Sequence, residues 1–144
     1  MKMDAINILA VYTITAVVFL LIDLFWLGIV AKGFYARHLG HLLREQVNWP
    51  AAVVFYLVYI AGIQVFVVGP ALLGDWRMGH AALLGGMLGF FAYCTFDLTC
   101  MALFNAWPLV VTIVDIVWGT LLTAATAATA LFVARTMLKT VGMT

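Results

Sequence analysis

The feature that most constrains this chain is a series of four apolar segments, each long enough to cross a membrane as a helix. A helix needs about 20 residues to cross a hydrocarbon core ~30 Å thick. The expected helices are Ala5–Ala31, Pro50–Pro70, His80–Asn105 and Pro108–Ala134. Hydrophobic residues make up 67% of the sequence and charged residues 9%, which leaves too few polar groups to cover a water-soluble globule. The sequence therefore predicts an integral membrane protein.

Short links between the segments predict a single transmembrane domain over residues 1–144, folded as an all-α bundle of four helices. The motifs FLLIDL and YCTFDL align at their aspartates, and two Trp-Pro pairs each begin a later helix, so two tandem helical hairpins are one possible arrangement. The first segment is longer than the apolar part of a secretory signal and contains an aspartate. We therefore interpret it as an uncleaved first helix.

Both ends of the chain should lie on one side of the membrane, because the number of spans is even. The basic residues on that side are Lys2, Arg77, Arg135 and Lys139, and those on the other side are Lys32, Arg37 and Arg44. Loops rich in lysine and arginine tend to stay in the cytoplasm. The charge distribution therefore favours cytoplasmic termini.

Three aspartates, Asp23, Asp97 and Asp115, interrupt the apolar segments. Asp23 and Asp97 each lie eight residues before the end of a predicted helix, and Asp115 lies seven residues after the start of the last one. At 1.5 Å per residue, all three lie roughly 10–12 Å inside the membrane face opposite the termini. A carboxyl group in hydrocarbon is costly and usually functional. The aspartates are therefore candidates for a shared ligand- or proton-binding site.

Aromatic side chains accompany the aspartates. The candidates are Trp26, Trp118, Tyr93, Tyr56 and Tyr59. Both indoles follow an aspartate by three residues, which puts them on its helix face. One tyrosine precedes the third aspartate by one turn, and the two on the second helix lie at a matching depth, where they could donate hydrogen bonds to the acids. Alternatively, the aromatic residues only pack and the aspartates only hold helices together.

Small residues recur at four-residue steps on the last two predicted helices. They are Gly85 and Gly89 on the third helix, and Gly119, Thr123 and Ala127 on the fourth. This spacing lets helix backbones approach closely in a bilayer. Gly86 lies eleven residues before Asp97, on nearly the same helix face. Asp97 should therefore point toward a neighbouring helix.

The segment KGFYARHLGHLLREQVN is the one long polar stretch. Its pattern predicts a short interfacial helix over Phe34–Leu43, between the first two spans and above the acids. His38, His41 and Glu45 would then share a helix face that could bind a metal. Their spacing matches no established metal motif, so we expect no metal site and interpret the histidines as solvated interfacial side chains.

Several motifs together resemble a known family. They are FWLGIVAKGFYARHLGHLL, the NWP start of the second helix, FDLT followed by a WP start, and VDIVWGT. The series resembles the small bacterial membrane proteins catalogued as domain of unknown function 2177, over nearly the whole chain. That family usually has Asn after DLT, where this chain has Cys100. The resemblance implies a four-helix, multi-pass protein of the bacterial inner (plasma) membrane, and it implies no biochemical activity.

The aspartates lead to three functional hypotheses. The first is proton- or cation-linked binding or transport of a small solute, because three close carboxyl groups cannot all be ionised and can exchange a proton for a cation. The ligand would be a proton, a metal cation or an organic amine, with Trp26 and Trp118 suited to cation–π contact. The second is an intramembrane enzyme acting on a lipid or isoprenoid substrate, and the third is a structural assembly subunit.

The expected partners are the lipid bilayer, a small cation, amine or lipid, and a second copy of the chain if transport needs a wider pathway. No phosphate-binding loop, dinucleotide fingerprint or zinc-protease motif occurs in the sequence. The sequence therefore identifies neither a cofactor nor a nucleic-acid partner.

Overall fold

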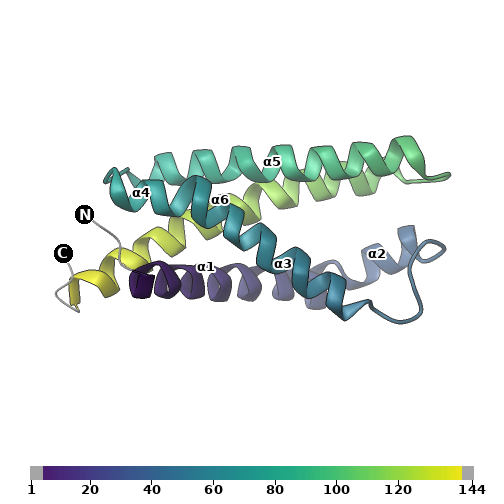
Figure 1. Cartoon of the computed structure of the whole chain (residues 1–144). Coiled ribbons are helices and arrows are strands. Elements are labelled where there is room, and N and C mark those ends of the chain that lie inside the picture. Colours follow the sequence, from purple (N-terminus) through teal and green to yellow (C-terminus); the bar gives the residue numbers. More distant parts are fainter. Residues whose placement is uncertain (1–4, 141–144) are drawn as a thin grey trace.

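Four long apolar helices run back and forth along the long direction of the molecule (Figure 1). The computed structural model describes residues 5–140. The helices long and apolar enough to span a membrane are Ala5–Val30, Trp49–Leu73, Met78–Leu103 and Leu109–Thr140. Within residues 5–140 there is no β-strand. The predicted all-α bundle of four transmembrane helices is confirmed.

The first two spans are interrupted by π-helical turns. The first consists of α1 (Ala5–Phe25) and η1 (Trp26–Val30), and the second of α3 (Trp49–Ile63), η2 (Gln64–Val68) and α4 (Gly69–Leu73). In the second span, Pro70 lacks an N–H and disturbs the α-helical pattern just before it. The Gly69 N–H therefore bonds to the Gln64 carbonyl oxygen. A Cβ at Gly69 would lie 2.8 Å from that oxygen, so the turn requires glycine.

The last two spans, α5 (Met78–Leu103) and α6 (Leu109–Thr140), form the most extensive helix pair. Their backbones approach closely where the small residues lie. A Cβ added to Gly85 would lie 2.7 Å from the Cβ of Ala127 and 2.8 Å from the Thr123 carbonyl oxygen. The predicted close packing of these helices is therefore confirmed. Helix α6 continues beyond the expected end at Ala134 to Thr140.

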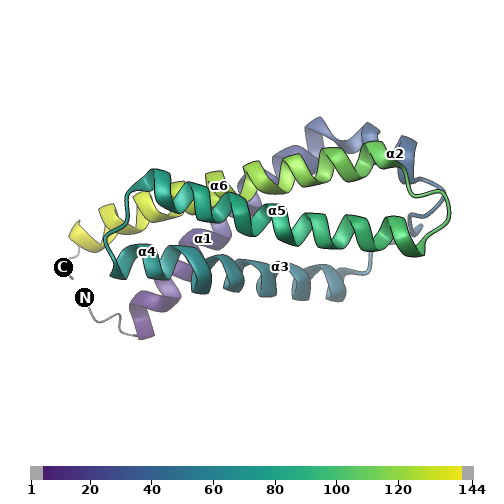
Figure 2. The ribbon, with the colours of Figure 1, turned by 90° about the horizontal axis from the view of Figure 1, so that it is seen from above.

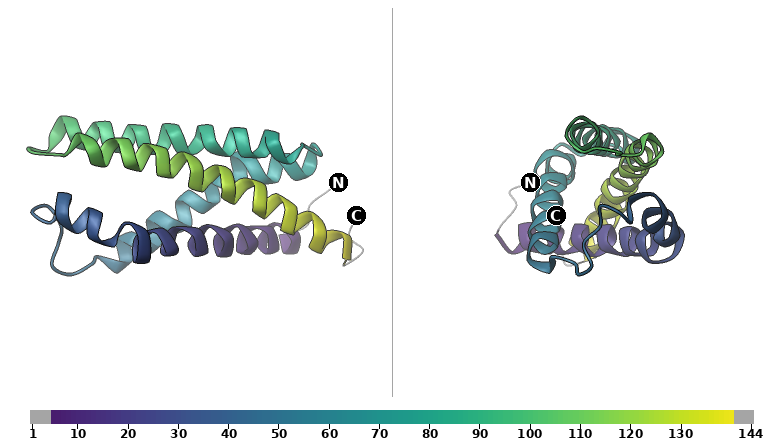
Figure 3. Two further views of the ribbon diagram at one scale, coloured as in Figure 1. Left: turned by 180° about the vertical axis from the view of Figure 1, so that it is seen from behind. Right: turned by 90° about the vertical axis from the view of Figure 1, so that its right-hand side faces the viewer.

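The first two spans pack less regularly. Helix α1 makes more contact with α6 than with α3, so the first helical hairpin is looser than the second. Figure 2 shows α3 beside α5 with the two ribbons separated, and Figure 3 shows that α1 begins and α6 ends at the same end of the molecule. The largest fully buried side chains include Phe19, Ile60, Ile63, Leu122 and Leu131. The core therefore lies between α1, the second span and α6.

The polar segment forms a helix shorter than predicted. Helix α2 spans Lys32–Leu39, and residues 40–42 form a turn. The expectation of a helix over Phe34–Leu43 was therefore right about the element but wrong about both of its bounds. At the start of α3, the Asn48 side chain accepts a hydrogen bond from the Ala51 N–H at 3.3 Å, a typical helix cap.

Candidate functional site

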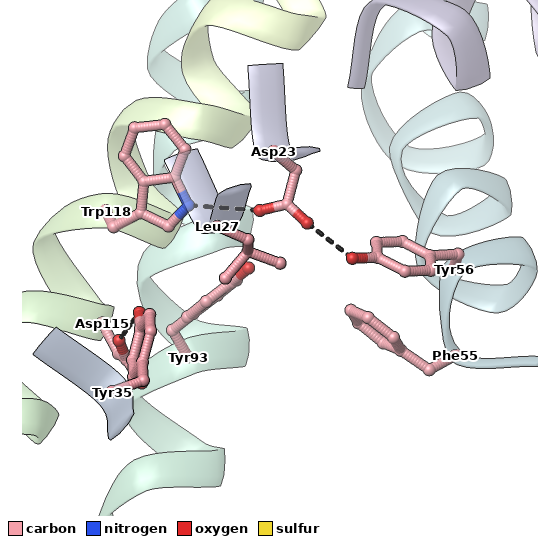
Figure 4. A pocket seen from close by; sticks show the side chains of 8 residues that line it. All are labelled: Asp23, Leu27, Tyr35, Phe55, Tyr56, Tyr93, Asp115 and Trp118. Atoms are coloured by element: carbon pink, nitrogen blue, oxygen red, sulfur yellow. Dashed lines mark hydrogen bonds between the residues drawn. The ribbon is translucent and has the colours of Figure 1, made fainter. Parts of the chain in front are cut away.

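Asp23 lies in the last turn of α1, where its side chain meets two other spans. The Tyr56 hydroxyl of α3 donates to Oδ2 at 2.7 Å, and the Trp118 Nε1–H of α6 donates to Oδ1 at 3.3 Å (Figure 4). Asp23 is only 4% exposed. Each carboxylate oxygen thus has a donor from a different helix, which compensates the burial of a polar group.

Asp115 of α6 is held by the short polar helix. The Tyr35 hydroxyl of α2 donates to Asp115 Oδ1, and the Trp26 Nε1–H donates to the Tyr35 oxygen at 3.4 Å. Burial raises the pKa of Tyr35, and the hydrogen bond to Asp115 acts in the same direction. The Tyr35 hydroxyl therefore stays protonated and remains a donor.

Two stacked indoles are linked by hydrogen bonds to these aspartates, one directly to Asp23 and the other through Tyr35 to Asp115. The rings of Trp26 and Trp118 lie 4.2 Å apart between centroids, at an interplanar angle of 10°. Trp118 donates to Asp23, whereas Trp26 donates to the tyrosine that binds Asp115. A single aromatic pair therefore positions donors for both acids.

A cavity of about 230 Å³ lies between the two aspartates. Its lining residues are Asp23, Leu27, Tyr35, Phe55, Tyr56, Tyr93, Asp115 and Trp118 (Figure 4). They supply two carboxyl groups and five aromatic rings. Figure 4 draws no hydrogen bond between Tyr93 and the other residues that line the cavity. Carboxylates with aromatic faces around them form a suitable environment for a cation.

Asp97 differs from the other two aspartates. It is 0% exposed, and neither carboxyl oxygen has a hydrogen-bond partner within the described part of the chain. Its side chain does not line the cavity, although it is close enough to Asp115 for their charges to interact. The structure therefore brings Asp23 and Asp115 to one cavity, while Asp97 is buried on α5 and faces the bundle as expected.

The predicted tyrosines have different surroundings. Tyr56 donates to an aspartate as expected, whereas Tyr59 does not: its hydroxyl shares a hydrogen bond of 2.8 Å with Thr123. Tyr93 lines the cavity, and its ring lies directly against Gly119, where any Cβ would overlap it. Glycine at this position therefore lets Tyr93 pack against α6 at the cavity.

Sequence reasoning missed Tyr35 as a site residue. Tyr35 lies in the polar segment, and its contact with Asp115 spans 80 positions of sequence. The available signal was its place inside the motif KGFYARHL, one of the stretches that carry the family resemblance. Phe55 and Leu27 were also missed, since an apolar side chain on an apolar helix carries no distinguishing pattern.

The histidines His38 and His41 lie on either side of the end of α2. Because α2 ends at Leu39, His38, His41 and Glu45 do not lie on one helical face, and that expectation was wrong. The His38 Nδ1 lies 2.9 Å from the Phe34 carbonyl oxygen, within its own helix. Among residues 5–140, no group of three or more His, Cys, Asp or Glu side chains could hold a metal ion.

Comparison with known proteins gives a family and no relative of known activity. No curated protein and no solved structure matches the chain. A family model described as "Predicted membrane protein (DUF2177)" matches residues 8–132, which include Asp97 and every residue that lines the cavity. The matched region covers most of the 144 residues and all four apolar helices in whole or in large part. The chain therefore belongs to the family of predicted membrane proteins that share domain of unknown function 2177.

Proposed function

We propose that this protein binds a small organic cation, an amine or ammonium ion, within the membrane and couples its binding or transport to proton exchange. The observation that carries the proposal is the cavity in which two carboxyl groups from different helices face five aromatic rings. Carboxylates attract positive charge, and a desolvated cation gains about 2 kcal/mol from an aromatic face. The same cavity offers little to an anion.

An organic cation fits this lining better than a metal ion does. A metal ion of the calcium or magnesium type needs about six or more oxygen ligands around it. Here both Asp23 oxygens already accept hydrogen bonds, and most of the remaining wall is aromatic carbon. An ammonium group needs only charge compensation and aromatic faces, which the cavity supplies.

Asp97 is the proposed proton carrier. An ionised carboxyl group that is fully buried and has no partner would be very costly, so the neutral acid is the favoured form. A cation next to Asp115 would favour ionisation of Asp97, because the two carboxyl groups interact. Binding of the cation should therefore release a proton from Asp97.

Calorimetric titration of tetramethylammonium into the protein in nanodiscs tests this proposal. Asp23→Asn and Asp115→Asn should each raise the Kd by about tenfold or more, because each removes a negative charge from the cavity. Asp75→Asn is the matched control, since Asp75 is 96% exposed in the turn before α5. Equal affinity in all four proteins would disprove the proposed site.

Proton coupling is measured in the same titration by repeating it in buffers with different ionisation enthalpies. The wild type should release protons on binding, and Asp97→Asn should bind the cation without releasing them. Release that persists in Asp97→Asn would assign the proton to another group.

One observation favours the enzymatic alternative. Asp23 has two hydrogen-bond donors, whereas Asp97 has none within the described residues, so one carboxyl group could be ionised and the other protonated. Acid–base catalysis on a lipid or isoprenoid substrate needs such a difference. Incubation with a bacterial lipid extract followed by mass spectrometry would show a modified lipid, absent with Asp97→Asn.

The structural alternative is an assembly subunit in which Asp23 serves only to join α1, α3 and α6. In that case ammonium ions would not bind, and Asp23 variants would alter stability alone. For the cellular setting we propose the inner (plasma) membrane of a bacterium, with one transmembrane domain and cytoplasmic termini. Two copies would associate if transport requires a wider pathway than one bundle encloses.

A further inference from the structure

A second cavity adjoins the one lined by Asp23 and Asp115, which we call the acidic cavity. It is a groove of about 380 Å³ between α3 and α5, and its lining residues are Phe55, Tyr59, Ala92, Tyr93 and Phe96. Phe55 and Tyr93 also line the acidic cavity, so the two spaces share a wall. Among residues 5–140, no charged side chain lines the groove. The acidic cavity and the apolar groove are therefore direct neighbours on either side of Phe55 and Tyr93.

The groove lies at the side of the bundle. Phe55 is 46% exposed and Phe96 is 59% exposed. Both residues lie on helices that are long and apolar enough to span a membrane, where exposed side chains would face lipid. A molecule dissolved in the bilayer could therefore enter the groove laterally without crossing water.

From this arrangement we propose that the ligand is a single-chain cationic amphiphile. Its ammonium head would lie between Asp23 and Asp115, and its hydrocarbon chain would lie in the groove along Ala92 and Phe96. The inference rests on the proposed function and names the ligand class of that same site. The acidic cavity, at about 230 Å³, is smaller than the ~300–1,000 Å³ of typical ligand pockets, so it has room for a head group and not for a whole lipid.

The lining also selects against a lipid with a phosphate next to its amine. A phosphate would lie either beside the two aspartates, where like charges repel, or in the groove, where it would lose its hydration. In the described part of the chain, neither cavity is lined by an arginine, lysine or histidine that could compensate the phosphate charge. The geometry therefore favours an amine-headed amphiphile without phosphate.

Two probes with the same head group separate the two cavities: tetramethylammonium, which has no chain, and dodecyltrimethylammonium. Binding of each is measured by equilibrium dialysis against the full-length protein in nanodiscs. A longer chain also partitions into the bilayer itself, so the deciding comparison is between protein variants in identical nanodiscs. The groove variants are Ala92→Phe, which fills the groove, and Phe96→Ala, which removes an exposed part of its wall. Ala102→Phe, at an exposed position of α5 outside both cavities, is the matched control.

Ala92→Phe should weaken dodecyltrimethylammonium binding by about tenfold, while Ala102→Phe leaves it unchanged. Phe96→Ala should also weaken dodecyltrimethylammonium binding. Tetramethylammonium should bind the groove variants and the wild type equally, which also shows that these variants are folded. Dodecylphosphocholine, which carries a phosphate, should bind the wild type about tenfold more weakly than dodecyltrimethylammonium.

Different results would overturn different parts of the proposal. Asp23-dependent binding of tetramethylammonium, with no effect of Ala92→Phe and Phe96→Ala on the long-chain probe, would overturn the amphiphile and leave the cation site standing. Equally tight, Asp23-dependent binding of dodecylphosphocholine would overturn the phosphate-free head group. Absence of Asp23-dependent binding of either ammonium probe would overturn both the inference and the proposed function.

Discussion

Tyr35 shows how one side chain can fix the position of a short helix. Helix α2 has only 8 residues, and isolated helices shorter than about 12–15 residues are marginal in water. Its tertiary hydrogen bonds run through the Tyr35 hydroxyl, which accepts from Trp26 and donates to Asp115. We therefore expect the order of α2 to depend on this hydroxyl.

Tyr35→Phe should loosen α2 without unfolding the bundle. Amide hydrogen exchange measured by mass spectrometry should accelerate over residues 32–39 by on the order of tenfold, which corresponds to the loss of one charge-assisted hydrogen bond. Tyr12→Phe is the control, because the Tyr12 hydroxyl donates to the Leu57 carbonyl oxygen in another part of the structure. Unchanged exchange in α2 would show that other contacts hold it.

Asp97 and Asp23 should respond in opposite ways to replacement by leucine. Asp97→Leu removes a buried carboxyl group that has no partner among the described residues, so thermal stability in detergent should stay the same or rise. Asp23→Leu leaves the Tyr56 hydroxyl and the Trp118 N–H without their acceptor and should cost about 1–3 kcal/mol. Circular dichroism during heating measures both. A large loss of stability in Asp97→Leu would mean that Asp97 has a structural partner after all.

At the scale of the elements, helices α5 and α6 can pack closely only because glycines at their contact carry no side chain. A Cβ at Gly89 would overlap the Gly119 carbonyl oxygen and lie 2.7 Å from the Thr123 hydroxyl. Near Gly79, on the same helix, nothing lies within 4 Å of the added carbon. The two glycines therefore provide a matched pair of substitutions.

Gly89→Ala should destabilise the protein by about 1–3 kcal/mol, because the methyl group must push two backbones apart. Gly79→Ala should be neutral or stabilise the helix by up to about 1 kcal/mol. Unfolding midpoints in mixed micelles give the comparison. If both variants unfold alike, close approach does not hold these helices together.

The turn between α4 and α5 is fastened by Arg135 of α6. Its Nη2 donates to the carbonyl oxygens of Trp76 at 2.8 Å and Ala71 at 3.3 Å, and it pairs with Asp75 at 2.9 Å. Asp75→Asn should cost less than about 1 kcal/mol, because the ion pair is exposed to solvent. Arg135→Met should cost more, because two carbonyl groups also lose a donor. Urea titration measures the stability of both variants. Equal losses of stability would mean that the ion pair alone holds the turn in place.

The whole molecule is closely packed at one end and open at the other. From Trp49 to Tyr59, no residue of α3 is buried, whereas Ile60, Ile63, Val67 and Val68 further along this span are. The two cavities lie in the open half, and the small-residue contacts of α5 with α6 extend from there toward the closed half. The closed half thus supplies rigidity, and the open half leaves room for a ligand.

Membrane orientation decides from which side that open half is reached. With cytoplasmic termini, a green fluorescent protein fused after Thr144 should fluoresce in bacteria, and a periplasmic alkaline phosphatase fused there should be inactive. The opposite pattern would put the cavities near the cytoplasmic face.

The sequence predicts the parts of this fold that depend on hydropathy and spacing. Four apolar segments give four helices, and the spacing of Trp26 from Asp23 places it among the donors of the site. The π-helical turns depend on individual backbone hydrogen bonds, from the Ala31 N–H to the Trp26 carbonyl oxygen and from the Gly69 N–H to the Gln64 carbonyl oxygen, which hydropathy does not reveal. The contact of Tyr35 with Asp115 depends on how the polar segment folds back, which no local pattern encodes.

The stacked pair Trp26 and Trp118 gives the site an optical signal of its own. Electronic transitions of two indoles whose ring centroids lie 4.2 Å apart couple to each other, and this coupling shifts their absorption bands. The shift persists only while the first and last spans are held together at the cavity. The integrity of the site could therefore be followed spectroscopically in an unlabelled protein.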